Sequence, residues 1–196
     1  MLLTRGTTGS STEYNAASIP SCGVHAQITT PSTSEQLKIG DRAELPENSI
    51  EPYANVTKFA SLVMTMMYLA RMTRADILLP VTVLAGRIKS PCMADYEAAC
   101  RLLTYIYSTP DYGILFRVEA GLLLRIYTDA SHALHGDGKG HGGMIMTLGS
   151  GYIFAKSGKL KCVTLSSTES ESVVMCEAAT YVVWIRGMMD FFGCRF

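Results

Sequence analysis

The chain has 196 residues, of which 48% are hydrophobic and 17% charged, so it can build one or two globular domains and is not globally disordered. Lysine plus arginine equals aspartate plus glutamate at 17 each, so any contact with a polyanion needs a local basic patch. The cysteines form no CxxC pair, which argues against a zinc knuckle or a redox motif. They are Cys22, Cys92, Cys100, Cys162, Cys176 and Cys194.

No segment indicates secretion or a membrane span. Residues 1–3 are followed at once by a polar run over 4–15, unlike a secretion signal. The most apolar stretch, 59–84, is interrupted by charged residues and by Pro80. We therefore expect an intracellular chain, cytoplasmic or nuclear, with free thiols and no membrane partner.

The first half of the chain predicts an arm followed by helices. Residues 1–50 are rich in Ser, Thr, Gly and Pro without sustained periodicity, which indicates a poorly ordered arm or the remnant of a larger domain. Residues 51–112 form a helical region. Its apolar residues recur at helical spacing before and after a polar break at Thr73-Arg74, and a third helix follows Pro91 over 93–107.

The second half, residues 113–196, predicts strands covered by one helix. The runs 113–118 and 122–128 are expected to pair, and 143–148 and 152–155 to form a hairpin around Gly149-Ser150-Gly151. A helix over 167–191 follows, with Val174, Ala178 and Ile185 on its sheet-facing stripe. The fold class is α/β: a helical segment, then a three-stranded antiparallel meander with a covering helix.

Asp129 is the first candidate metal ligand. It follows the apolar strand, where a central strand would emerge from the sheet and its carboxylate could meet an ion. The alternative is a structural aspartate that starts a turn with Ala130-Ser131.

Glu171 is the second candidate. At 100° per residue it falls on the stripe that faces the sheet, whereas Glu169 should face solvent or the helix N-terminus. The alternative is a capping box in which Glu171 reaches back to the Thr168 amide. A carboxylate on the strand and another on the first turn of the returning helix suit a hard divalent cation and phosphodiester chemistry.

Two weaker signals remain open. The cluster Lys156, Lys159 and Lys161 is a candidate nucleic-acid contact, or a solvated strand edge. A second cluster is a candidate transition-metal site, or simply a glycine-rich hairpin connection. Its members are His132, His135, His141 and Asp137.

The third helix carries Tyr96, Tyr105 and Tyr107. Packing in a core or between subunits is the expected role of these rings, and base stacking is the alternative. We assign them no site role.

Several sequence motifs resemble those of the polymerase polyproteins of copia-type retrotransposons. The most specific is LSSTESE at residues 165–171, which is followed by WIR at residues 184–186. Others are YTDAS at 127–131, HGG at 141–143 and the lysines near 160. Upstream, 62–78 is similar to the segment that links reverse transcriptase to ribonuclease H, and the similarity begins near Leu45.

By this resemblance, Asp129 is the first and Glu171 the second acidic ligand of a ribonuclease H site. That site holds two Mg²⁺ ions and cuts RNA in RNA–DNA hybrids, within the remainder of a polymerase polyprotein. The family's later acidic ligands lie on elements beyond Phe196, and the family usually has proline at Ala75 and glutamine at Leu160.

The resemblance implies a polyprotein fragment: the reverse transcriptase remnant, the helical connection and an incomplete ribonuclease-H-like fold. We expect weak or absent nuclease activity, because two carboxylates leave two metal ions under-neutralised. The alternatives are a non-catalytic interaction or nucleic-acid-binding module and a degenerate element remnant.

Overall fold

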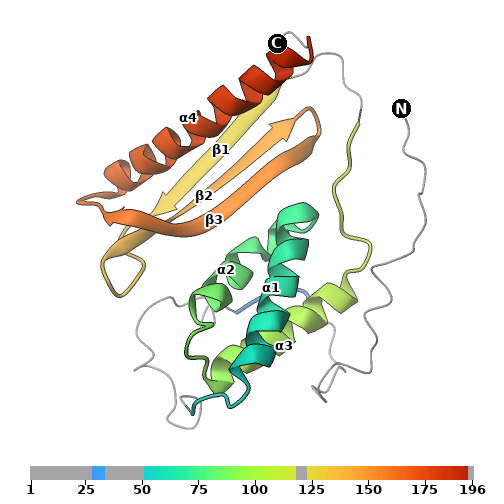
Figure 1. Ribbon diagram of the computed structural model, residues 1–196, viewed down its shortest axis with the longest axis vertical. Coiled ribbons are helices and arrows are strands. Elements are labelled where there is room, and N and C mark those ends of the chain that lie inside the picture. The colour runs from blue at the N-terminus through green and yellow to red at the C-terminus, as the bar shows by residue number, and fades with distance from the viewer. Residues whose placement is uncertain (1–27, 34–50, 118–122, 194–196) are drawn as a thin grey trace.

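The computed structural model describes residues 28–33, 51–117 and 123–193. Its helices are α1 (Val56–Met72), the 3-10 helix η4 (Ala75–Ile77), α2 (Leu78–Gly86), α3 (Met93–Ser108) and α4 (Ser167–Phe191). Its strands are β1 (Leu124–Ser131), β2 (Lys139–Leu148) and β3 (Gly151–Val163). Figure 1 shows α1, α2 and α3 grouped beyond β3, with α4 lying along β1.

The helical group has its own apolar core. Phe59, Val63, Ile77, Val81 and Leu102 are almost completely buried. The expected break at Thr73-Arg74 is confirmed between α1 and η4. None of the described helices is long and apolar enough to cross a membrane.

A buried guanidinium stabilises that break. The side chain of Arg74 is only 4% exposed, with its Nε 2.9 Å from Asp76 Oδ1 and its Nη1 2.8 Å from the carbonyl oxygen of Thr109. Removing this arginine would leave Asp76 Oδ1 and the Thr109 carbonyl oxygen without this donor, while Asp76 Oδ2 would keep its hydrogen bond from the Tyr105 hydroxyl. The break is therefore tied to the end of α3 as well as to η4.

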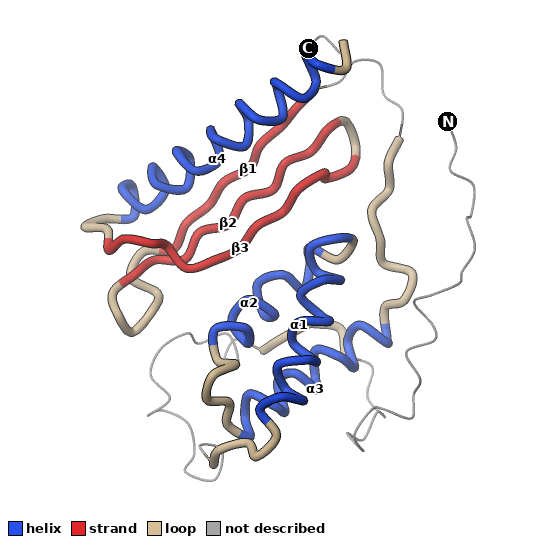
Figure 2. The backbone as a smooth tube through the Cα atoms, viewed as in Figure 1, coloured by secondary structure: helices blue, strands red, loops and turns tan. Residues whose placement is uncertain are grey.

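The three strands form an antiparallel sheet in the order β1-β2-β3. The expected second hairpin is confirmed, with Leu148 opposite Gly151 and Gly149 at φ 70°, a turn conformation that favours glycine. The expected strand at 113–118 is wrong: residues 113–117 form a loop (Figure 2), Val118 lies outside the described residues, and β1 pairs with β2 instead.

Helix α4 covers one face of the sheet at the predicted bounds, 167–191. Val174, Ala178 and Ile185 are buried against Met144 and Met146 of β2. This layer is a second apolar core, which confirms the predicted antiparallel meander with its covering helix.

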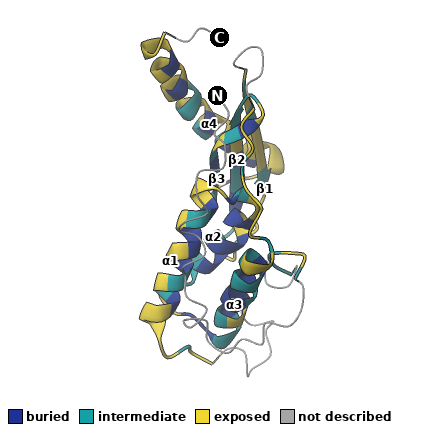
Figure 3. Cartoon of the chain, turned by 90° about the vertical axis from the view of Figure 1, so that its right-hand side faces the viewer, coloured by how far each residue is buried: buried dark blue, intermediate teal, exposed yellow. Residues whose placement is uncertain are grey.

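The sheet connects the two cores. Figure 3 shows buried residues in both the helical group and the sheet layer. Ala155 belongs to the helical core, and Tyr152 Oη accepts a hydrogen bond from Ala75 N at 3.1 Å. The division at residues 112–113 stays a prediction, and most of the predicted arm, 1–50, lies outside the described residues.

Candidate functional site

Asp129 lies within β1, two residues before the strand ends, and its residue is exposed. It pairs with Gly143 of β2, and its Oδ1 accepts a hydrogen bond from Ala130 N at 2.9 Å. Side chains alternate along a strand, and Ala130 packs on the α4 core, so Asp129 belongs to the opposite face. In the described sheet, β1 is an outer strand, which leaves the carboxylate beside an open edge.

Glu171 lies on the first turns of α4 and is exposed. The expectation that its side chain faces the sheet is wrong, because Ser170 is the buried residue at this point of the helix. Ser170 stands four and Glu171 three positions before Val174, and the two residues are about 100° apart around the helix. The helical spacing was therefore compatible with either residue on the stripe that faces the sheet.

The alternative role for Glu171, a capping box with Thr168, is also wrong. Helix α4 begins at Ser167, its N-cap is Ser166, and Ser166 Oγ accepts a hydrogen bond from Glu169 N at 3.2 Å. Glu169 Oε2 accepts from Leu165 N at 2.7 Å, which confirms that Glu169 serves the helix N-terminus. Ser166 and Glu169, and not Glu171, therefore cap the start of α4.

A polar network that is buried at Thr164 and Ser170 connects the segments that carry the two carboxylates. His132 Nδ1 lies 3.2 Å from Thr164 Oγ1, which lies 2.6 Å from Ser170 Oγ. His132 is three residues after Asp129, and Ser170 is next to Glu171. The network therefore joins the end of β1 to the start of α4. Sequence reasoning missed it, although Ser170 stands four residues before Val174 on the buried stripe.

The two carboxylates supply oxygen ligands of the kind that Mg²⁺ prefers. The part of the chain that the structure describes holds no cluster of three or more His, Cys, Asp or Glu side chains able to bind a metal. Asp129 lies on the face of the sheet opposite α4, which carries Glu171. A shared cation between the two residues stays a prediction, and it would have to form around the open edge of β1.

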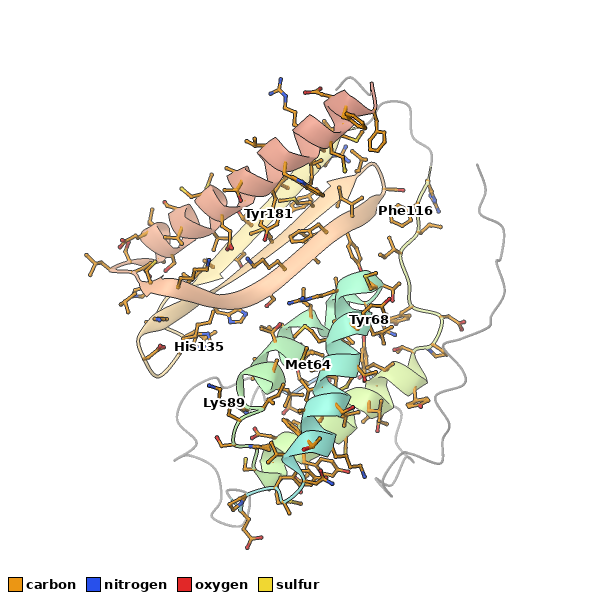
Figure 4. The ribbon with its side chains drawn as sticks, viewed as in Figure 1. Met64, Tyr68, Lys89, Phe116, His135 and Tyr181 are labelled. Carbon is orange, nitrogen blue, oxygen red and sulfur yellow. The ribbon has the colours of Figure 1, made fainter. Side chains whose placement is uncertain are left out.

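The three candidate lysines line one hollow of about 350 Å³ between the sheet and α4. Lys156 forms an ion pair with Glu177 and lies 5.6 Å from the ring centre of Tyr181, which Figure 4 shows on α4. Burial alone would lower the pKa of Lys156, but the Glu177 carboxylate raises it overall. Lys159 lies 2.7 Å from Asp137, and Lys161 is exposed.

The histidine cluster divides in two. His135 Nε2 lies 3.2 Å from His141 Nδ1, whereas His132 contacts Thr164. The prediction that three histidines and Asp137 form one metal site is therefore wrong, because the described residues do not gather into one such cluster.

Comparisons with known proteins identify relatives of two kinds. The chain is 35% identical over 130 residues to the Secreted RxLR effector protein 161 of Plasmopara viticola, covering 65% of this chain and 90% of that protein. It is 31% identical over 172 residues to the retrovirus-related Pol polyprotein from transposon RE2 of Arabidopsis thaliana, covering 86% of this chain and 11% of the polyprotein. The corresponding polyprotein from transposon TNT 1-94 of Nicotiana tabacum is 30% identical over 169 residues, which cover 85% of this chain and 12% of that polyprotein.

No protein-family model matches the chain. No solved structure matches it either. The chain thus spans most of the effector protein but only about a tenth of each of these Pol polyproteins. The predicted family is confirmed: the chain belongs to the copia-type retrotransposon Pol polyproteins.

Proposed function

We propose that this chain is the part of a Pol polyprotein that contains the end of reverse transcriptase, its helical connection and the leading half of a ribonuclease H domain. Asp129 and Glu171 would be two of the ligands to Mg²⁺, and the reaction of the whole enzyme would be hydrolysis of RNA in RNA–DNA hybrids. The observation that supports this most is the His132, Thr164 and Ser170 network, which joins the segments carrying the two carboxylates.

The chain by itself should cleave weakly or not at all. Two carboxylates provide too little negative charge to hold two divalent ions close together. The test is a cleavage assay on an RNA–DNA hybrid with and without Mg²⁺. Efficient cleavage that Asp129→Asn abolishes would overturn the prediction of a weak enzyme but would support the assigned ligand.

A non-catalytic interaction module is the second candidate. The alignment covers 90% of a protein named as an effector, so a protein of comparable extent exists outside a polyprotein. The lysine hollow supports a nucleic acid as the ligand of such a module. Hybrid binding that is independent of Mg²⁺ would favour this candidate, and Mg²⁺-dependent binding lost in Asp129→Asn would favour the nuclease.

The family function also implies an intracellular location, since the hybrid is an intracellular nucleic acid. Cys92, Cys162 and Cys176 are free thiols in the structure, which fits a reducing compartment. Fractionation of cells that express the chain would test this, and recovery mainly from the medium would contradict it.

A further inference from the structure

Two histidines face each other beside the loop that connects β1 to β2. Nε2 of His135 lies 3.2 Å from Nδ1 of His141, and the rings stack with their centres 5.4 Å apart. His141 is 8% exposed, whereas His135 is half-buried on the loop, where Figure 4 shows it. One of the two rings is thus fixed in the structure and the other is accessible from solvent.

Backbone and side-chain hydrogen bonds hold the two histidines in place. His135 N donates to Lys139 O at 2.9 Å, and Gly138 N donates to His135 O at 2.8 Å, which closes the loop at its base. His141 belongs to β2, and its Nε2 lies 2.8 Å from Ser157 Oγ on β3. When Nε2–H of His141 donates to that hydroxyl, Nδ1 keeps a free lone pair directed at His135.

This arrangement has the geometry of a pair of metal ligands. Two nitrogens that bind one tetrahedral ion at about 2.0–2.1 Å lie about 3.3 Å from each other, close to the spacing found here. We propose that His135 Nε2 and His141 Nδ1 bind a divalent transition-metal ion of the Ni²⁺, Cu²⁺ and Zn²⁺ group, with water completing the coordination. Imidazole suits these ions better than it suits Mg²⁺.

Ser157 has the supporting role in this site. A ligating histidine commonly uses its second ring nitrogen to donate to an oxygen, which fixes both the tautomer and the ring orientation. Binding requires His135 to carry its proton on Nδ1, so no proton is gained or lost by the protein when both rings begin neutral.

The surroundings favour neutral rings. Burial and the charge of His135 lower the pKa of His141 to about 4, and burial with the nearby Lys159 lowers the pKa of His135. The carboxylate of Asp137 lies 2.7 Å from Lys159 and offsets its repulsion of a cation. The site shares no residue with Asp129 or Glu171, so it is independent of the proposed nuclease function.

The test is calorimetric titration of the full chain with Ni²⁺ at pH 7.5, in a His25→Gln background. We expect one ion to bind, with affinity lost in His135→Gln and unchanged in His132→Gln, because His132 contacts Thr164 instead. Ser157→Ala should weaken binding by roughly 10- to 100-fold through the second ring nitrogen of His141.

A second readout separates ligation from a folding defect. Ni²⁺ is paramagnetic, so NMR signals of the His135 and His141 rings should broaden while those of His132 persist. Circular dichroism would confirm that each variant is folded. Equal Ni²⁺ binding by folded His135→Gln, or no binding by the parent chain, would overturn the proposal.

Discussion

The hydroxyl oxygens of Thr164 and Ser170 lie 2.6 Å apart, and both residues are buried where the chain leaves β3 and enters α4. Ser170 Oγ also donates to the carbonyl oxygen of Ser166 at 3.1 Å. Thr164 must then donate to Ser170, and His132 can donate to Thr164. The four residues form one chain of hydrogen bonds that joins β1, β3 and α4.

Ser170→Ala should destabilise the protein. The substitution leaves the buried Thr164 hydroxyl without its acceptor, at a cost of about 1–3 kcal/mol. Ser172→Ala is the matched control, because Ser172 is exposed on the same helix and its hydroxyl only donates to Thr168 O. Urea denaturation measures both variants, and equal stabilities would contradict a role for the network.

Gly142→Ala should also destabilise the protein. A Cβ at Gly142 would lie 2.5 Å from Val174 Cγ2 and 3.1 Å from Leu160 Cδ2, so α4 would have to shift. Overpacking of this kind costs about 1–3 kcal/mol. Gly158→Ala on β3 is the control, since its Cβ would meet nothing within 4 Å. Thermal denaturation should separate the two variants, and a stable Gly142→Ala would show that α4 packs less closely.

Stability should fall as the solution becomes more acidic than pH 6.5. Burial lowers the pKa of His141 from 6.5 to about 4, so between these values the unfolded chain binds a proton that the folded chain does not. The free energy of unfolding therefore decreases as the pH falls through this window. The contribution of His141 to this decrease has a limiting slope of about 1.4 kcal/mol per pH unit.

Urea denaturation at several pH values between 4 and 7.5 would measure that slope. His141→Gln should flatten the profile, whereas His132→Gln should leave the His141 contribution in place. A profile that is identical in the parent chain and in His141→Gln would contradict the assignment.

If the lysine hollow contacts a nucleic-acid backbone, Lys161 should contribute more than Lys156. Lys161 is exposed, whereas Lys156 is paired with Glu177. Lys161→Ala should weaken hybrid binding and reduce the salt slope by about 1. Lys58→Ala, an exposed lysine on α1, is the control. Equal slopes for all variants would exclude the hollow as the contact.

Helix α4 was predictable because its buried side chains recur at helical spacing over many turns. One residue that departs from this spacing does not hide the pattern. The strand at 113–118 was not, because a short apolar run does not say which segment it pairs with. The side chain of Phe116 lies so close to Gly151 that a Cβ there would be 2.6 Å from Phe116 Cδ1, and Arg117 N donates to Ser150 Oγ. This segment therefore packs beside the β2-β3 turn as a loop.

The two candidate carboxylates were found from their predicted places at a strand end and on a helix stripe, but their orientations were not predicted correctly. Periodicity places a residue on a helix face only to within about one position, which is why Ser170, and not Glu171, is the buried residue at the start of α4. The face of Asp129 followed only from the packing of its neighbour Ala130 against the α4 core, because side chains alternate along a strand. The His132 network depends on contacts between distant segments, which no local pattern encodes.

Mn²⁺ replaces Mg²⁺ at oxygen ligands and broadens nearby NMR signals, so it tests most directly whether Asp129 and Glu171 share a cation. We expect Mn²⁺ to broaden amides around residue 129 and around residue 171 together. Asp129→Asn or Glu171→Gln should abolish both effects, while Asp190→Asn, at the far end of α4, should change neither. Broadening at one segment alone, or at neither, would contradict the shared site.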